Sequence, residues 1–118
     1  MMEYILVGAG GALGSLARYL LGKKISAKSY SKLPFGTFII NVSGAVLLGL
    51  VINIRISGNL YLLFADGFLG AYTTFSTFMY ESFHLFKDNK LNSTAYIISS
   101  LILGFTGFAS GIAISNLL

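Results

Sequence analysis

The stretch GAYTTFSTFMYES, residues 70–82, sets hydroxyl side chains into the middle of a long apolar segment. That segment runs from Leu60 to Phe86, so its midpoint falls near Tyr72 and Thr73. Glycine and hydroxyl residues at such a midpoint favour a local break in a helix. We therefore expect two half-helices here. The polar and aromatic residues around the break are Gly70, Thr73, Thr74, Phe75, Ser76, Thr77 and Phe78.

The composition of the whole chain is typical of a membrane protein. Of its 118 residues, 55% are hydrophobic and 10% are charged, and the mean hydropathy is +0.79. Soluble domains carry about 25% charged residues, so this chain has too few charges to cover a water-facing surface. It has no cysteine for a disulfide or a thiolate metal site, and its single histidine, His84, has no partners for a zinc site.

Four apolar segments are long enough to cross a bilayer, whose core of about 30 Å needs about 20 residues per helix. We expect these spans at residues 2–22, 34–54, 60–86 and 91–117. Pro34, the only proline, opens the second span at a first-turn position, where its missing N–H costs nothing. The N-terminus lacks the basic head and cleavage site of a secretory signal, so the first span should remain. The sequence predicts an all-α integral membrane protein with one transmembrane domain, residues 1–118.

The charges of the loops predict the orientation of the chain. An even number of spans places both termini on one side of the membrane. The first and third loops carry six lysines, against a single arginine in the second loop: Lys23, Lys24, Lys28, Lys32, Lys87 and Lys90 against Arg55. The lysine-rich loops are therefore expected in the cytoplasm and both termini outside. The net charge of +4 reflects this topology and does not indicate a nucleic-acid partner.

Glycines in the first and fourth spans predict close helix packing. The run YILVGAGGALG resembles the glycine-rich turn that binds a dinucleotide, but that turn needs an acidic residue about 20 positions on, and residues 26–33 contain none. The glycines are better explained by helix packing, because small residues spaced by four let helix backbones approach closely in a membrane. Two such pairs are Gly10 with Gly14 and Gly107 with Gly111.

Polar residues inside the spans are candidates for function, because polar groups are costly in hydrocarbon. In the second span, Thr37 and Asn41 lie four residues apart, and in the fourth span Tyr96 and Ser100 repeat this spacing. Each pair therefore shares one helical face. Either pair could hold helices together, at about 0.6 to 2 kcal/mol per contact, or line a polar path, and the spacing alone leaves both interpretations open.

The third span indicates ion conduction. Irregular backbone at the bilayer midplane is tolerated where it is buried in protein or lines a polar site, and broken helices at that depth bind ions in many transport proteins. Freed carbonyls suit a small cation. Phe75 and Phe78 share one face and present ring edges, which are the electropositive rim of the ring. Together with the Asn41 amide and the hydroxyls, they offer weak donors in series, and such donors suit a small anion that must also leave.

Three stretches of the chain closely resemble the signature stretches of the CrcB/Fluc fluoride channels, in the order and spacing of that family. They are GALGSLARY (11–19), PFGTFIINVSGAVLLG (34–49) and GFLGAYTTFSTFMYE (67–81). The resemblance covers essentially the whole chain. It implies a channel, not an enzyme, that exports fluoride passively and selectively as an antiparallel dimer. It also implies a structural sodium ion between the two broken third helices.

The resemblance implies a role for particular residues. Gly70 and Thr73 would supply backbone carbonyls to the sodium ion. Phe75 and Phe78 would line the fluoride path, with Asn41 as the amide donor. Arg18 and Glu81 match the arginine and the acid of the family, as direct contacts of fluoride or as an ion pair or capping interaction. The polar track would comprise Ser76, Thr77, Tyr96 and Ser100.

The charge bias of the loops departs from the simplest picture of that family. Many members have nearly balanced loops and insert in both orientations, whereas six lysines against one arginine predict a single orientation. The chain is therefore expected to pair with an oppositely oriented paralogue. Two alternatives remain. The first is a small multidrug-type proton-coupled exporter, but such an exporter needs an acidic residue deep in the first span, and the only acid of that span, Glu3, lies at its start. The second is a non-conducting supporting subunit of a heterodimeric channel.

Overall fold

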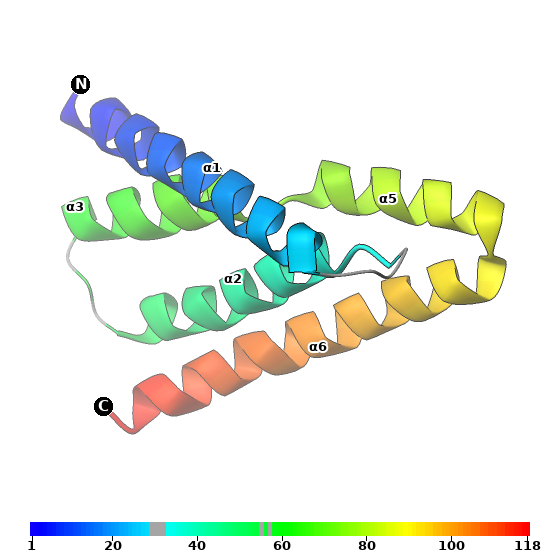
Figure 1. Ribbon diagram of the computed structural model, residues 1–118. Helices are drawn as coiled ribbons and strands as arrows, with labels where there is room; N and C mark the ends of the chain where they lie inside the picture. The colour runs from blue at the N-terminus through cyan, green and yellow to red at the C-terminus, as the bar shows by residue number, and fades with distance from the viewer. Residues whose placement is uncertain (29–32, 55, 57) are drawn as a thin grey trace.

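The computed structural model describes residues 1–28, 33–54, 56 and 58–118, and every regular element within these ranges is a helix. Figure 1 shows the helices as long rods, one of which is interrupted near its middle. The expected all-helical fold with a broken third span is confirmed. The elements are α1 (Met2–Lys28), α2 (Phe35–Asn53), α3 (Gly58–Tyr61), the π-helix η1 (Leu62–Leu69), α4 (Gly70–Tyr72), α5 (Phe75–Asp88) and α6 (Lys90–Asn116).

Three of the helices are by themselves long and apolar enough to cross a membrane. They are α1, α2 and α6, with mean hydropathies of 1.4, 2.2 and 1.9 over their most apolar windows. The third span is divided among α3, η1, α4 and α5, so none of its pieces reaches the length of a crossing helix. The chain is therefore a membrane protein whose third crossing is discontinuous.

Most helix ends lie within two residues of the sequence-based expectation, and the end of α1 and the start of α2 need comment. Helix α1 continues to Lys28 instead of ending near residue 22, so Lys23 and Lys24 lie on the helix and not in a loop. Lysine and leucine are good helix formers, and long lysine side chains can reach the membrane surface from a helix end. Residues 29–32 of the expected loop lie outside the described residues. Pro34 precedes α2 instead of lying in its first turn, and its carbonyl accepts the Phe38 N–H at 3.2 Å.

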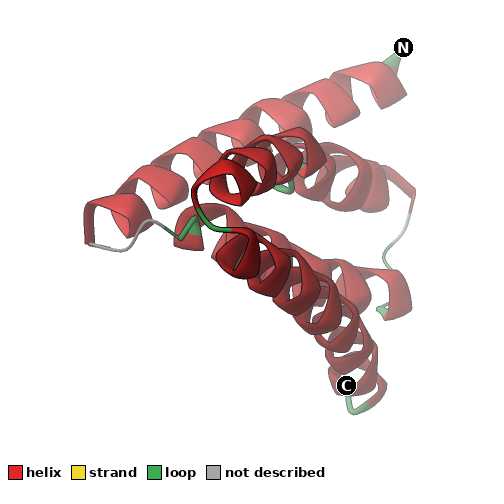
Figure 2. Cartoon of the chain, turned by 90° about the vertical axis from the view of Figure 1, so that its right-hand side faces the viewer, coloured by secondary structure: helices red, strands yellow, loops and turns green. Residues whose placement is uncertain are grey.

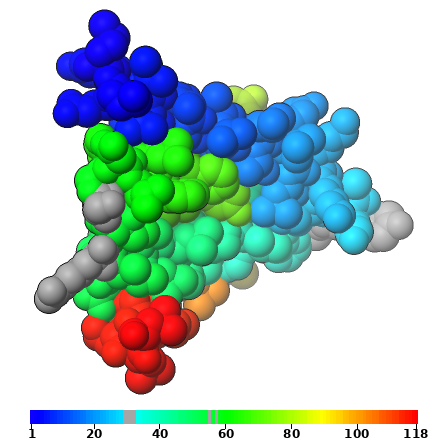
Figure 3. All heavy atoms as spheres, turned by 90° about the vertical axis from the view of Figure 1, so that its left-hand side faces the viewer, coloured from blue at the N-terminus to red at the C-terminus, as the bar shows by residue number. Residues whose placement is uncertain are grey.

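Both termini lie at one end of the molecule. Figure 1 places the N-terminus, the C-terminus and the start of α3 at the left, and the turn between α5 and α6 at the far right. Figure 3 views the left-hand end and shows α3 between the two terminal segments. This arrangement agrees with an even number of crossings.

Glycines bring the helix backbones into direct contact, as the glycine pairs predict. A Cβ atom on Gly14 would collide with the carbonyl of Phe68 in the third span. Similarly, a Cβ atom on Gly111 of α6 would collide with the carbonyl of Val46 in α2. Close approach of this kind increases van der Waals contact between helices where lipid provides no hydrophobic drive. The glycines therefore hold α1 to the third span and α6 to α2.

Few hydrophobic side chains are buried, and they form two small clusters between the helices. One cluster contains Ile40, Leu69 and Tyr72, and a second contains Phe78, Leu85 and Tyr96. Figures 1 and 2 place α1 and α6 at opposite edges of the chain. Most large apolar side chains of these outer helices are exposed in the single chain, for example Phe105 at 73%. Such surfaces suit lipid or a second subunit.

Candidate functional site at the helix break

The third span is broken at two residues, and a side chain of α2 holds the break. Thr73 and Thr74 have extended backbones, with ψ angles of 155° and 121°, between the end of α4 at Tyr72 and the start of α5 at Phe75. Asn41 closes two hydrogen bonds with the backbone of Thr74. Its Nδ2 donates to the carbonyl at 2.9 Å, and its Oδ1 accepts the N–H at 2.8 Å. The amide thereby replaces the helical partners that the break removes.

The two threonines use their hydroxyls to end one helix and begin the next. The Thr73 hydroxyl donates to the carbonyl of Leu69 at 3.0 Å. The Thr74 hydroxyl accepts the N–H of Thr77 at 3.3 Å, which makes Thr74 the N-cap of α5. These two hydroxyls are therefore engaged in local structure, and the polar groups that remain for an ion come from other residues.

One side of the break forms a pocket of about 470 Å³ that contains Gly70 and Thr73. In a continuous helix the Gly70 carbonyl would accept the N–H of Thr74, but that N–H donates to Asn41. Carbonyl oxygens are ligands of hard cations. No group of three His, Cys, Asp or Glu side chains that could hold a metal occurs in the described part of the chain. The oxygen that the break leaves without its helical partner is therefore the carbonyl of Gly70.

The two phenylalanines of the break differ in exposure. The side chain of Phe75 is 74% exposed, whereas Phe78 is 7% exposed. Their ring centroids lie 6.3 Å apart with the planes tilted by 45°. Phe78 also packs against Tyr96 of α6 at 5.3 Å. Phe78 is thus fixed in the chain, while Phe75 projects from it.

The other side of the break forms a pocket of about 270 Å³ that combines four of the predicted path residues. One N–H of the Asn41 amide donates to Thr74, and its second N–H has no partner among the described residues. The buried hydroxyls of Tyr96 and Ser100 have no hydrogen-bond partner within the described part of the chain either. The pocket is lined by Asn41, Thr73, Thr74, Phe75, Phe78, Ser100 and Leu101, and Tyr96 lies against Phe78.

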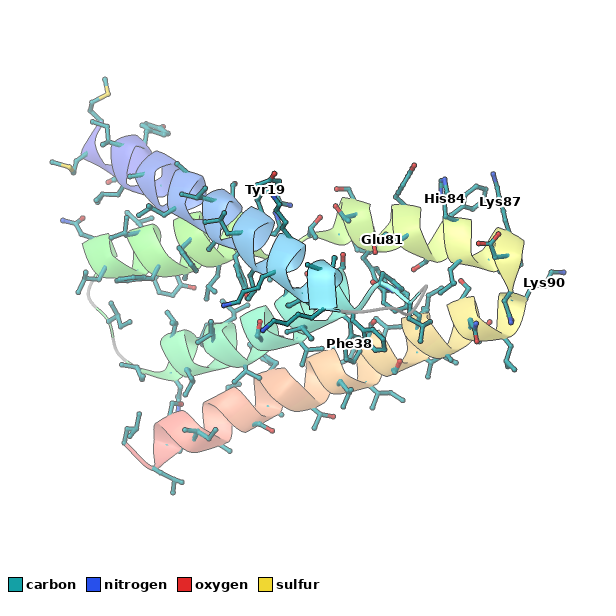
Figure 4. All side chains as sticks on the ribbon, in the orientation of Figure 1. Tyr19, Phe38, Glu81, His84, Lys87 and Lys90 are labelled. Carbon is teal, nitrogen blue, oxygen red and sulfur yellow. The ribbon has the colours of Figure 1, made fainter. Side chains whose placement is uncertain are left out.

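Other predicted residues lie in a separate pocket of about 480 Å³ between α1, α2 and α5. Arg18, Thr77 and Glu81 line this pocket, and Glu81 accepts a hydrogen bond from the hydroxyl of Thr37. Figure 4 shows Glu81 on the side of α5 that faces the other helices. Arg18 and Glu81 share the pocket without forming an ion pair in the described chain. Ser76 is exposed on the first turn of α5.

Two features of the site were not expected from the sequence. The segment before the break, Leu62–Leu69, is a π-helix, and it carries Asp66 into the pocket that contains Gly70 and Thr73. Asp66 is the only acidic residue of the third span before the break. An ionisable residue inside a span is by itself a signal of function, so the residue type was a sufficient clue.

The chain is similar to proteins of known name over nearly its whole length. The family described as CrcB-like protein, Camphor Resistance (CrcB) matches residues 5–112. The "Fluoride-specific ion channel FluC 2" of Clostridium acetobutylicum is 56% identical over 98% of this chain and 100% of that protein. The "Fluoride-specific ion channel FluC 1" of Carboxydothermus hydrogenoformans is 35% identical over 98% and 95%. The "Fluoride-specific ion channel FluC" of Acidobacterium capsulatum is 40% identical over 98% and 97%.

Proposed function

The chain belongs to the CrcB family, and we propose that it is a fluoride-selective channel that lets fluoride leave the cell passively. It is a channel and not an enzyme. The observation that carries the proposal is the pocket that combines Asn41, Phe75, Phe78 and Ser100 beside the helix break. Each of these residues offers a partial positive charge, from an N–H, a hydroxyl or a ring edge. The proposed location is the cell membrane.

The unpaired donors of this pocket explain how a small anion is accepted. Transfer of a small anion out of water is opposed by a Born penalty of order 20 kcal/mol at low dielectric. The second Asn41 N–H and the buried Ser100 hydroxyl of this pocket have no partner in the described chain, and neither has the buried hydroxyl of Tyr96, which packs against Phe78, so an arriving anion would satisfy donors that are already available. No full positive charge lines this pocket, so the ion is also free to leave.

The exposure of Phe75 supports an antiparallel dimer. A side chain that is 74% exposed at the midplane, next to an open pocket that contains the Asn41 amide and the Ser100 hydroxyl, would line one half of a path. A second subunit that inserts in the opposite direction would cover Phe75 and complete the lining. The numbered names of relatives, FluC 1 and FluC 2, fit a partner from the same family.

The loop charges support an oppositely oriented paralogue as that partner. The lysine-rich segments are proposed to lie in the cytoplasm and both termini outside, because six lysines oppose one arginine. A chain held in one orientation cannot supply the inverted copy of an antiparallel pair. A homodimer would require copies in both orientations.

A sodium ion is proposed to bind between the two breaks. The Gly70 carbonyl, which lacks its helical partner, and the extended Thr73 face one pocket. In the dimer, two such pairs of carbonyls would supply the oxygen ligands and would offset the charge of the ion. The ion would thereby join the subunits at the point where their helices are interrupted.

The alternative functions lack support in the site. The only acid on α1 is Glu3, in its first turn and exposed, so a proton-coupled exporter would have no carboxylate deep in the first span. No observation on the chain favours a non-conducting subunit, because the donors of the proposed path are present.

Ion efflux from liposomes tests the proposed function. The purified chain, together with its partner if one is required, should release fluoride rapidly and chloride at least about a hundredfold more slowly, because a larger anion gains less from each donor. An empty-liposome control measures the leak. Comparable rates for chloride and fluoride would show that the small-anion proposal is wrong.

A further inference from the structure

Asp66 is a carboxylate inside the third span that has no ion-pair partner among the described residues. It lies on η1, seven residues before Thr73, which corresponds to about 10 Å along a helix. Since the hydrocarbon core extends about 15 Å to each side of the midplane, the carboxylate lies within it. Its side chain is exposed in the single chain and forms no ion pair among the described residues. A bare charge at this depth requires a counter-charge.

The position of Asp66 indicates which positive charge could balance it. Asp66 precedes Gly70 by four residues, so both lie on one helical face, and both line the 470 Å³ pocket with Thr73. The anion donors Phe75, Phe78 and Ser100 line the other pocket, and only Asn41 and Thr73 belong to both. The negative charge is thus on the side of the Gly70 carbonyl and away from Phe75, Phe78 and Ser100, whereas Asn41 lies at the boundary of the two pockets.

We propose that Asp66 is the outer counter-charge of the cation held at the helix break and that it raises the affinity of this site for sodium. The inference rests on the proposed sodium ion of the channel. Asp66 precedes Gly70 by four residues and Thr73 by seven, about 6 and 10 Å along a helix, so it acts through the electrostatic field and not as a direct ligand. At an effective dielectric constant of about 20, a unit charge about 10 Å away changes cation affinity by about tenfold.

The proposal makes the two charges depend on each other. The cation neutralises a carboxylate that would otherwise face lipid or the second subunit, and the carboxylate offsets the loss of hydration that neutral carbonyls only partly replace. Loss of the carboxylate should therefore weaken cation binding while leaving the anion donors in place. A basic residue of the second subunit is the competing counter-charge for Asp66, and the experiment below distinguishes it from a bound sodium ion.

The test is a sodium titration of the assembled protein, with the thermal unfolding midpoint as the readout. Sodium replaces N-methyl-D-glucamine at constant ionic strength, and the rise of the midpoint with concentration gives the apparent Kd. We expect the Kd of D66N to be about tenfold weaker than that of the wild type. D66E, which keeps the charge, should resemble the wild type. D88N is the matched control, because Asp88 is an exposed acid at the end of α5.

The outcomes separate the inference from the proposed function. An unchanged Kd in D66N overturns the inference, as does an equal shift in D88N. If Asp66 instead pairs with a basic residue of the second subunit, D66N lowers the midpoint equally at all sodium concentrations, which also overturns it. If D66N assembles poorly in low sodium, molar sodium should restore it, and failure to do so counts against the inference. Fluoride efflux of the wild type is measured independently and tests the channel function alone.

Discussion

Replacement of Asn41 by alanine tests whether this side chain holds the helix break. In the wild type, the amide forms two hydrogen bonds with the backbone of Thr74, at 2.9 and 2.8 Å. Alanine removes both, and leaves one N–H and one carbonyl unsatisfied at the midplane, where no water replaces them. Each unsatisfied buried group costs about 1–3 kcal/mol. We therefore expect N41A to lose about 2–6 kcal/mol of stability.

The loss should be concentrated at the break. Hydrogen exchange of the backbone amides of residues 72–78 should accelerate strongly in N41A, and fluoride efflux should fall because the free amide N–H of the pocket is also removed. N53A is the matched control, because Asn53 is another α2 amide that hydrogen-bonds to a neighbouring helix. Its partner is Asn116 of α6, at the exposed end of α2. N53A should exchange normally at the break. If N41A exchanges there at the wild-type rate, the amide does not hold the break and our reading of the site is wrong.

Three further changes test the path, the packing and the topology. F78I and F75I keep an apolar side chain but lose the positive ring edge, so each should lower fluoride efflux while the protein still folds; unchanged efflux in both would reduce the rings to packing. G111A forces a Cβ atom into the Val46 carbonyl and should cost about 1–3 kcal/mol in thermal unfolding. G104A on the same helix meets nothing within 4 Å, so it should be neutral or stabilising, and equal losses would contradict the close-packing argument. A reporter fused to the C-terminus should be found outside only, and the chain expressed alone should protect a fluoride-sensitive host poorly until an oppositely biased partner is supplied; a reporter in both compartments would restore the homodimer.

The spans and the break were predictable because both depend on local properties. Hydropathy adds up residue by residue, so the apolar segments define α1, α2 and α6 to within a few residues at most ends. The larger error, at Lys28, arose because a helix can continue beyond the bilayer core into the polar region. Gly70, Thr73 and Thr74 disfavour a continuous helix, and the break occurs there.

Distances between residues far apart in sequence were not predictable in the same way. The spacing of Thr37 and Asn41 predicts a shared face, but it does not say that one bonds to Glu81 and the other to the Thr74 backbone. These contacts depend on the register between α2 and the third span. That register is set by side-chain packing over the whole length of the helices.

Composition and local conformational preference are enough to predict that this chain crosses the membrane with helices, that the third crossing is interrupted, and which residue types could serve an ion. Only the tertiary structure divided those residues between pockets. It placed Asn41, Phe75, Phe78 and Ser100 together, moved Arg18, Thr77 and Glu81 to a second pocket, and set Asp66 beside Gly70. The physical reason is that a pocket is formed by the relative rotation and depth of packed helices. Neither quantity is encoded in any single segment of the sequence.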